Sequence, residues 1–246
     1  MYYTLSKGPQ GAPALVLLHG AGGSRLLWPP QLRRLPGAMV YTLDLPGHGR
    51  SGGQACDTVT SYAEAIVAFL DEVGIARAVI AGHSMGGAIA LTLALDFPDR
   101  VAGLVLVASG ARLRVAPAVL DGLHADFAGA VELLNRLTWS PGISPALVER
   151  GRQALLEAGL AVLLSDLTAC DRFDVMERLG GIAAPTLVVA GSADVLTPLK
   201  YARFLAEHIP AARCEVVEDA GHMLMLERPA EVTRAVRGFL GNRAGS

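Results

Sequence analysis

The chain has little cysteine, little lysine and little net charge. Its three cysteines (Cys56, Cys170 and Cys214) lie far apart and match no metal-ligand spacing. An odd number of thiols without a secretion signal indicates reduced side chains in the cytoplasm. The formal net charge of -2 at pH 7 predicts no attraction to nucleic acid or to an anionic membrane surface. The composition therefore gives no indication of a nucleic-acid-binding protein.

Linkers, repeats and long apolar runs are also missing from the sequence. The segment 1–7 lacks a charged stretch followed by an apolar one, so we expect no signal peptide. The longest apolar stretches look strand-sized or amphipathic, which predicts no membrane span. No Pro/Ser/Gly-rich linker or charge run divides the 246 residues, which favours one domain. Hydrophobic residues make up 52% of the chain and charged residues 18%, a balance typical of a protein with a large core.

Short apolar runs alternate with helical patterns. Runs of this kind, without polar alternation, are typical of parallel strands that are buried on both faces. They lie at 14–18, 39–43, 78–81, 103–107 and 186–190, and the helical patterns lie at 61–73, 84–95, 199–208 and 229–240. Ser61 with Glu64 three residues later predicts the N-terminus of the first of these helices. The alternation predicts an α/β fold with a mostly parallel, doubly wound sheet.

One region interrupts this alternation. Residues 112–179 contain helical patterns but no strand-like run, with Ser144 and Pro145 beginning a helix that Gly159 ends. We predict that 112–179 forms a helical cap inserted into a core made of 1–111 and 180–246. The cap would cover the carboxyl ends of the strands, where doubly wound sheets bind ligands. An ordinary extra layer of helices is the alternative interpretation.

The hexapeptide Gly-His-Ser-Met-Gly-Gly at 82–87 joins a predicted strand to a predicted helix. A strand, a sharp turn with glycine two residues on either side of a serine, and a helix together form the context of a nucleophile elbow. Gly82 and Gly86 remove the Cβ atoms that would clash in so tight a turn. The pattern therefore predicts Ser84 as a nucleophile, whereas the alternative is an ordinary Gly-rich loop.

Four further motifs accompany this turn in the sequence. They read His-Gly-Ala-Gly-Gly at 19–23, Asp-Leu-Pro-Gly-His-Gly-Arg-Ser at 44–51, Gly-Ser-Ala-Asp-Val-Leu-Thr-Pro at 191–198 and Ala-Gly-His at 220–222. In this order and spacing the five motifs resemble the α/β-hydrolase superfamily, in its branch of capped serine esterases, enol-lactonases and meta-cleavage-product hydrolases. The resemblance covers nearly the whole chain and implies the α/β-hydrolase fold with a helical cap.

A serine hydroxyl needs a base within hydrogen-bond reach, and the base needs a carboxylate that fixes its tautomer. We predict His222 as the base and Asp194 as the carboxylate, because Ser, Asp and His then follow the order found in α/β-hydrolases. Asp219 is the alternative acid, but it lies only three residues from His222. Some family members place the acid after the strand before the cap, where this chain has Ala-Ser-Gly at 108–110.

The remaining histidines have other expected roles. His19 and His48 lie in motifs that resemble structural loops of the family, so we expect them to brace the backbone. His83 is expected to pack inside the elbow. His124 and His208 fall on helical patterns and are expected to be solvated.

An acyl-transfer intermediate needs two donors for its oxyanion. The backbone N–H of Met85 follows the nucleophile, and the resemblance implies that the N–H of Ala21 is the second donor, with Gly22 as the near alternative. The Gly-rich loop could instead cradle a phosphate, but no nucleotide-binding motif accompanies it.

The cap is expected to supply a mostly apolar substrate pocket, with Gly22 and Trp28 from the oxyanion side. The candidate lining residues in the cap are Phe127, Leu134, Leu137, Trp139, Leu163, Leu164 and Leu167. Packing within the cap is the alternative role for each of them. Arg112, Arg114 and Arg136 are the cationic residues that could receive a substrate carboxylate.

We therefore expect a cytoplasmic carboxylesterase-type serine hydrolase for small to medium apolar acyl compounds, a monomer or homodimer that needs no cofactor and no metal. Haloalkane dehalogenases and epoxide hydrolases of this superfamily use Asp at the elbow, and Ser84 argues against both. A carbon–carbon bond hydrolase or an enol-lactonase with the same triad is the first alternative. A non-catalytic ligand receptor with the hydrolase fold is the second.

Overall fold

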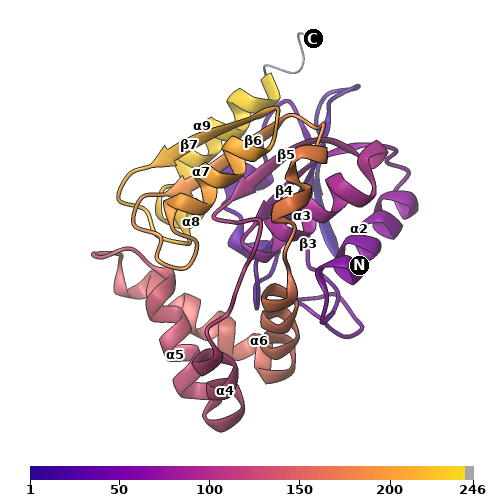
Figure 1. Ribbon diagram of the computed structural model, residues 1–246. Helices are drawn as coiled ribbons and strands as arrows, with labels where there is room; N and C mark the ends of the chain where they lie inside the picture. Colours follow the sequence, from indigo (N-terminus) through magenta and orange to yellow (C-terminus); the bar gives the residue numbers. More distant parts are fainter. Residues whose placement is uncertain (242–246) are drawn as a thin grey trace.

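The computed structural model describes residues 1–241, and their core is one seven-stranded sheet (Figure 1). The strand order is β1-β3-β2-β4-β5-β6-β7, and β1 alone among these strands pairs antiparallel. The strands are β1 (Tyr3–Ser6), β2 (Ala14–Leu18), β3 (Met39–Leu43), β4 (Ala78–His83), β5 (Val101–Val107), β6 (Thr186–Gly191) and β7 (Ala212–Val217). The predicted mostly parallel, doubly wound sheet is confirmed.

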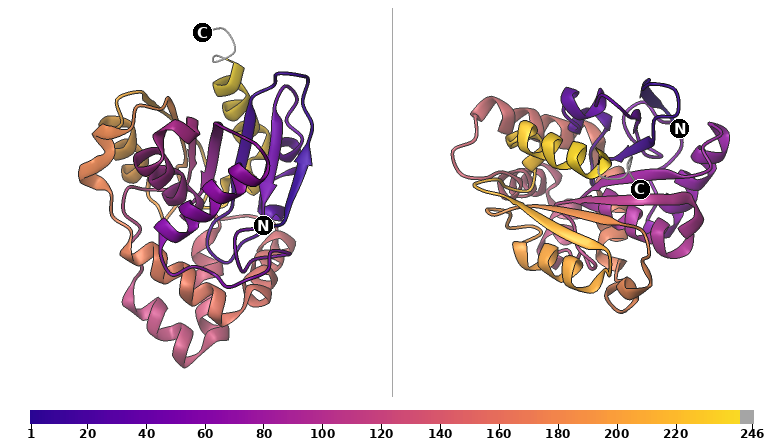
Figure 2. Two further views of the ribbon diagram at one scale, coloured as in Figure 1. Left: turned by 90° about the vertical axis from the view of Figure 1, so that its right-hand side faces the viewer. Right: turned by 90° about the horizontal axis from the view of Figure 1, so that it is seen from above.

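Helices cover both faces of this sheet (Figure 2). They are α1 (Pro30–Arg33), α2 (Val59–Glu72), α3 (Met85–Asp96), α4 (Pro117–Ala125), α5 (Phe127–Thr138), α6 (Pro145–Arg172), α7 (Leu199–His208), α8 (Leu224–Glu227) and α9 (Pro229–Gly241), with 3-10 turns at Arg25–Leu27, Pro98–Arg100 and Met176–Gly181. Helices α2, α3 and α7 bury their apolar sides in one core cluster, and α1 and α9 in another on the opposite face.

The central strands show why apolar runs without alternation form this sheet. Along β5, Leu104 and Leu106 belong to one core cluster, whereas Val105 and Val107 belong to the cluster on the other face. All four side chains are fully buried. Successive side chains of a strand point to opposite faces, so a strand covered by helices on both sides must be apolar at every position.

The start of α2 differs from the prediction. The helix begins at Val59, and Thr58 is its N-cap, with Thr58 Oγ1 accepting a hydrogen bond from the Ser61 amide at 3.1 Å. Ser61 was predicted as the N-cap, but its hydroxyl instead accepts from Thr58 Oγ1 at 2.8 Å. Thr58 and Ser61 are both hydroxyl residues that can cap a helix. Thr58 is the cap here, because its side chain accepts from the otherwise unpaired Ser61 amide.

Helices α4, α5 and α6 lie together beyond the carboxyl ends of the strands and form a separate layer (Figure 1). They share an apolar cluster of their own, which contains Leu123, Val131 and Leu163.

Helix α6 is not one straight helix. Gly159 has φ 82° and ψ 165°, so the helix predicted to end there does break, but a second helical stretch continues to Arg172. By length and composition alone α6 could cross a membrane, which the sequence analysis did not anticipate. Because of the break at Gly159, however, each part is shorter than the roughly 20 residues that a span requires.

Candidate active site

The turn between β4 and α3 holds Ser84 in a strained backbone conformation. Ser84 has φ 53° and ψ -116°, a region that residues with a side chain rarely adopt. The turn is tied to the sheet by the Ser84 amide, which donates to the Val107 carbonyl at 2.9 Å. The Ser84 carbonyl accepts from the Gly87 amide at 2.9 Å and from Ser109 Oγ at 2.8 Å. Strain that surrounding bonds hold in place is typical of functional sites.

Glycine is required on both sides of this turn. A Cβ atom at Gly82 would overlap the Gly86 carbonyl, and a Cβ atom at Gly86 would overlap the Leu18 carbonyl. Both obstacles are backbone atoms, which cannot rotate away. The steric reason that the sequence analysis gave for these two glycines therefore agrees with the structure.

Asp194 and His222 form a buried pair, and His222 lines the same cavity as Ser84. Asp194 Oδ2 lies 2.9 Å from His222 Nδ1 and also accepts from Thr197 Oγ1 at 2.7 Å. Asp194 Oδ1 accepts from the amides of Leu196 and Thr197 at 2.8 and 2.9 Å. Four donors thus fix one carboxylate, and one of the four is the imidazole.

These contacts determine the charge of Asp194. Burial raises the pKa of the Asp194 carboxyl, but the charge of His222 and the hydrogen bonds from His222 and Thr197 outweigh burial and hold that pKa well below its usual range. Asp194 is therefore ionised at neutral pH. The alternative acid, Asp219, is exposed and makes no hydrogen bond to His222.

His83 supports the loop that carries His222. Its Nε2 lies 3.0 Å from the His222 carbonyl oxygen, to which it donates, and the two rings are 4.9 Å apart between centroids. Burial and the charge of His222 lower the pKa of His83 to about 3. A neutral, buried imidazole that donates to a backbone carbonyl fits the predicted packing role.

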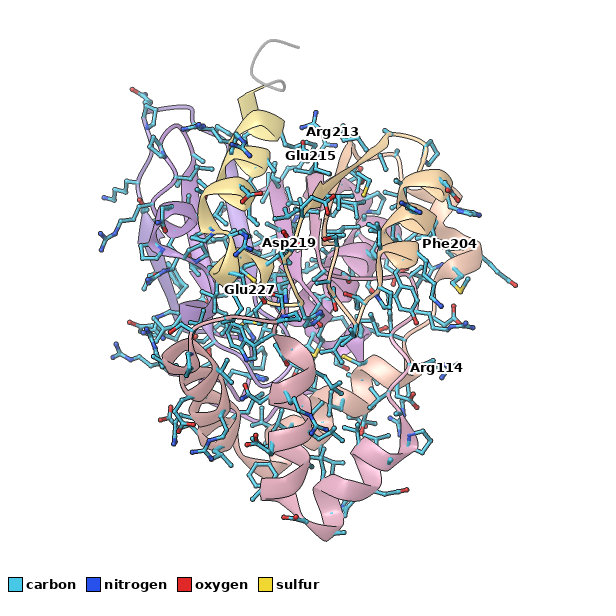
Figure 3. All side chains as sticks on the ribbon, turned by 90° about the vertical axis from the view of Figure 1, so that its left-hand side faces the viewer. Arg114, Phe204, Arg213, Glu215, Asp219 and Glu227 are labelled. Carbon is cyan, nitrogen blue, oxygen red and sulfur yellow. The ribbon has the colours of Figure 1, made fainter. Side chains whose placement is uncertain are left out.

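The loop of His222 is also attached to the end of α5. The His222 amide donates to the Thr138 carbonyl at 2.9 Å. Glu227 Oε2 accepts from the Gly221 amide at 2.8 Å and from Ser140 Oγ at 2.6 Å. Glu227 lies in the C-terminal segment above α4–α6 (Figure 3). No motif in the sequence marks Glu227 or Thr138, so neither residue was predicted to belong to the site.

The loop after β2 approaches Ser84 closely. A Cβ atom at Gly20 would lie 3.1 Å from Ser84 Cβ. Within residues 1–241, the backbone N–H groups of Ala21 and Met85 have no hydrogen-bond acceptor. The N–H of Gly22, the alternative oxyanion donor, is engaged elsewhere, because it donates to Asp166 Oδ2 at 2.7 Å.

His19 and His48 brace the backbone, as their motifs indicate. His19 Nε2 accepts from the Leu45 amide at 3.0 Å, and its Nδ1 donates to the Gly20 carbonyl at 2.8 Å. Burial and the charge of His48 lower the pKa of His19 to about 4. His48 instead faces two acceptors, the Pro46 carbonyl at 2.9 Å and Asp166 Oδ2 at 2.8 Å. No motif in the sequence marks Asp166, so this partner of His48 was not predicted.

A cavity of about 130 Å³ opens beside Ser84 and His222. Ala21 and Gly22 border it from the oxyanion side. Of the predicted cap residues, Leu134, Trp139, Leu163 and Leu167 line it. These residues come from α5, α6 and the segment just after α5. The helical layer therefore forms one wall of this cavity.

Four of the predicted pocket residues lie elsewhere. Trp28 is fully buried in the core cluster that α1 and α9 share and does not line the cavity. Phe127 and Leu164 pack against the apolar cluster of the helical layer, and Leu137 is outside the cavity lining. These four residues are therefore not part of the cavity lining, and packing accounts for their apolar side chains.

The cavity has few polar groups, and most are already paired. Asn135 Oδ1 accepts from Trp139 Nε1 at 3.0 Å, and Asn135 Nδ2 donates to the Val148 carbonyl at 3.1 Å. Thr138 Oγ1 donates to the Leu134 carbonyl. None of the lining residues in the described chain is Asp, Glu, Lys or Arg.

The three arginines suggested for carboxylate binding face other partners. Arg112 lies 3.7 Å from Asp174, and Arg114 donates to the Asp171 carbonyl. Arg136 borders a different surface hollow, next to Pro141. Among residues 1–241 there is also no cluster of three or more His, Cys, Asp or Glu that could hold a metal ion.

Comparison with known proteins gives a consistent result. The sequence is 35% identical to the dihydrolipoyllysine-residue acetyltransferase component of an acetoin cleaving system from Pseudomonas putida, over 95% of this chain but only 65% of that protein. It is 29% identical to 3-oxoadipate enol-lactonase 1 from Acinetobacter baylyi, over 95% of this chain and 90% of the relative. The structure of a thermophilic esterase matches with a TM-score of 0.86 and 36% identity, over 98% of this chain and 92% of that one. The model of the alpha/beta hydrolase family matches residues 15–235, and the chain belongs to this family of hydrolases.

Proposed function

We propose that this protein is a carboxylesterase-type serine hydrolase that cleaves small, uncharged, apolar esters. Ser84 is the nucleophile, His222 the general base, and Asp194 the carboxylate that orients His222. The observation that carries the proposal is that Ser84 and His222 line one largely apolar cavity, while Asp194 is hydrogen-bonded to His222 Nδ1. Residues 112–179 act as the cap over a core of 1–111 and 180–246, and the location is cytoplasmic.

The reaction proceeds in two acyl-transfer steps. Ser84 Oγ attacks the ester carbonyl carbon while His222 Nε2 takes the serine proton, and Asp194 stabilises the imidazolium that forms. The N–H groups of Ala21 and Met85 donate to the oxyanion, each contributing about 2.7–4 kcal/mol to the transition state. The ester C–O bond then breaks, and the alcohol leaves with the proton from His222. A water molecule that His222 deprotonates releases the acid and regenerates Ser84.

The size of the cavity supports short substrates. A dry cavity of roughly 150 Å³ is enough to hold benzene, and the cavity beside Ser84 measures about 130 Å³. An acyl chain of about four to six carbon atoms would fill it. Longer chains require the α5 and α6 walls to move apart.

A second candidate is an enol-lactonase or a carbon–carbon bond hydrolase with the same triad. The 29% identity with an enol-lactonase over nearly the whole chain favours it. Substrates of these enzymes carry a carboxylate, and a buried anion requires a cationic partner. Because the described lining holds no Lys or Arg, we place the uncharged ester first.

The test is hydrolysis of p-nitrophenyl acetate, butyrate, octanoate and laurate by the wild type and by Ser84→Ala. We expect turnover with an optimum at butyrate, a steep decline at laurate, and loss of turnover in the variant. Activity that persists in Ser84→Ala would refute the nucleophile. A wild type that cleaves none of the four esters would favour the carbon–carbon hydrolase or the non-catalytic receptor.

A further inference from the structure

Asp166 is a buried carboxylate that the proposed mechanism does not use. It lies in the second part of α6 and is 0% exposed. Its Oδ1 accepts from the Tyr62 hydroxyl at 2.5 Å, and its Oδ2 accepts from His48 Nε2 at 2.8 Å and from the Gly22 amide at 2.7 Å. Burying a charge costs several kcal/mol unless it is paired and hydrogen-bonded. Here one side chain of the helical layer binds three separate segments of the core.

The charge of Asp166 is balanced by His48. Both nitrogens of His48 face acceptors, the Pro46 carbonyl and Asp166 Oδ2, an arrangement that favours the doubly protonated, cationic ring. Burial lowers the pKa of His48, but the hydrogen bond to Asp166 and its charge outweigh burial and raise that pKa. The pair is enclosed, with both side chains fully buried.

The bond from Gly22 to Asp166 fixes the loop that carries the proposed oxyanion donor. Gly22 has φ 62°, and its N–H belongs to the peptide group between Ala21 and Gly22. Because Asp166 accepts from the Gly22 amide, that amide is not free to donate into the cavity. The neighbouring Ala21 amide is free of any acceptor in the part of the chain that the structure describes, and Ala21 lines the cavity. A preorganised donor of this kind costs no reorganisation during the reaction.

The same helix shapes the pocket. Leu163 and Leu167 of α6 line the cavity, one on each side of Asp166 in the sequence. A shift of α6 would therefore change the width of the pocket and, at the same time, break the hydrogen bond from the Gly22 amide to Asp166. Misplacing a catalytic group by about 1 Å can reduce the rate about 100-fold.

We propose that Asp166 is a positioning residue that couples the seating of α6 to the oxyanion hole: it holds the loop 20–23 so that the Ala21 amide, and not the Gly22 amide, donates to the oxyanion. This inference rests on the proposed esterase function. It assigns to a residue of the helical layer a part in transition-state stabilisation, without contact to the substrate.

The test compares Asp166→Asn and Asp166→Ala with Asp171→Asn. Asp171 is a matched control, because it is a carboxylate of the same helix that accepts a backbone amide, that of Val115 at 3.0 Å, away from the loop 20–23. Two readouts are used: kcat and KM for p-nitrophenyl butyrate, and the inhibition constant of a short trifluoromethyl ketone. Ser84 adds to this ketone to form a tetrahedral oxyanion, so its affinity reports on the oxyanion hole.

We expect kcat to fall about 10- to 100-fold in Asp166→Ala, below the roughly 10²- to 10³-fold loss for deleting a donor. Asp166→Asn should lose less, because its amide oxygen can still accept from the Gly22 amide. KM should change less than about threefold, and the inhibition constant should rise by the same factor as kcat falls. Asp171→Asn should retain kcat and ketone affinity within about twofold. A loss confined to KM or to thermal stability, with unchanged ketone affinity, would overturn the proposal.

Amide hydrogen exchange in the wild type tests the same arrangement without any variant. The Gly22 amide should exchange at least about 100-fold more slowly than the Ala21 amide, because only the former has an acceptor in the protein. Equal exchange of the two amides would contradict the proposal. This measurement needs no activity, and Ser84→Ala tests the esterase separately, so the two proposals fail by different results.

Discussion

The Nδ1 atom of His222 lies 2.9 Å from Oδ2 of Asp194, a carboxylate whose other donors all come from Leu196 and Thr197. The hydrogen bonds within the loop after β6 thus fix the Asp194 carboxylate independently of its bond to His222. A rigid acceptor fixes the tautomer of His222 with its proton on Nδ1. Nε2 is then the nitrogen that can accept a proton from Ser84.

Replacing Asp194 with Asn should change the tautomer of His222 without disturbing the fold. The Asn oxygen can still accept from the Leu196 and Thr197 amides, so the loop should keep its shape. Its NH₂ group would face His222 Nδ1, which must then accept and carry its proton on Nε2. We expect kcat for p-nitrophenyl butyrate to fall about 10⁴-fold with KM nearly unchanged.

Asp219→Asn is the control for this change, because Asp219 is the other acid near His222 in the sequence. We expect it to retain kcat within about twofold. If Asp219→Asn loses as much activity as Asp194→Asn, the assignment of the acid is wrong. Circular dichroism of both variants checks that the fold is retained.

The elbow should tolerate no side chain at Gly86. The added methyl group of Gly86→Ala would overlap the Leu18 carbonyl, and overpacking of this kind typically costs about 1–3 kcal/mol or more. We expect a lower free energy of unfolding in urea, or an insoluble protein. Gly238→Ala is the matched control in α9, where a Cβ atom meets nothing within 4 Å. It should stabilise the protein by about 0.5–1 kcal/mol, and equal effects of the two variants would refute the steric argument.

The sequence predicts the sheet and the elbow because both depend on local patterns. Apolar runs such as 103–107 form strands whose two faces are buried, and glycine at 82 and 86 is required by contacts within a short stretch of chain. Asp194 and His222 were identified from their motifs and from the chain order Ser, Asp, His. In the structure β6 and β7 are neighbouring parallel strands, so the loops that follow them lie together.

Contacts between distant and unmarked residues could not be predicted in this way. Asp166 looks like any polar residue on a helix, and its partner His48 lies 118 positions away. An apolar side chain likewise does not reveal which cluster it joins, which is why Trp28 was assigned to the pocket although it belongs to the core. Such assignments require the packing of α6 and α1 against the sheet.

The preferred ester length should depend on α5. Leu134 lines the cavity, whereas Leu137 of the same helix does not. Leu134→Ala should enlarge the cavity, so that kcat/KM for p-nitrophenyl octanoate rises relative to butyrate by about 10-fold. This factor corresponds to the roughly 1–3 kcal/mol by which a pocket discriminates one methylene group. Leu137→Ala should leave the ratio within about twofold, and a similar shift in both variants would contradict the pocket assignment.

Acid stability should depend on His83. Its ordinary pKa of 6.5 falls to about 3 in the folded protein, so between these pH values the unfolded chain binds one more proton than the folded chain. Stability is therefore lost as pH falls, by about 1.4 kcal/mol per pH unit. His83→Gln cannot titrate, and its amide can still donate to the His222 carbonyl. Between pH 6 and pH 4.5 the free energy of unfolding of the wild type should fall with decreasing pH. In His83→Gln the slope of this fall should be smaller by about 1.4 kcal/mol per pH unit.

The measurement is urea unfolding of both proteins at half-unit steps from pH 4.5 to pH 8. Near pH 8 almost no proton is bound at His83 in either state, so the two curves should run parallel there, which serves as the internal control. His19, whose pKa falls to about 4, and Asp194, whose pKa is also lowered, remain in both proteins and contribute to the residual slope in acid. Curves that stay parallel down to pH 4.5 would show that His83 is protonated in the folded state. The imidazole could then not be the neutral donor that supports the His222 loop.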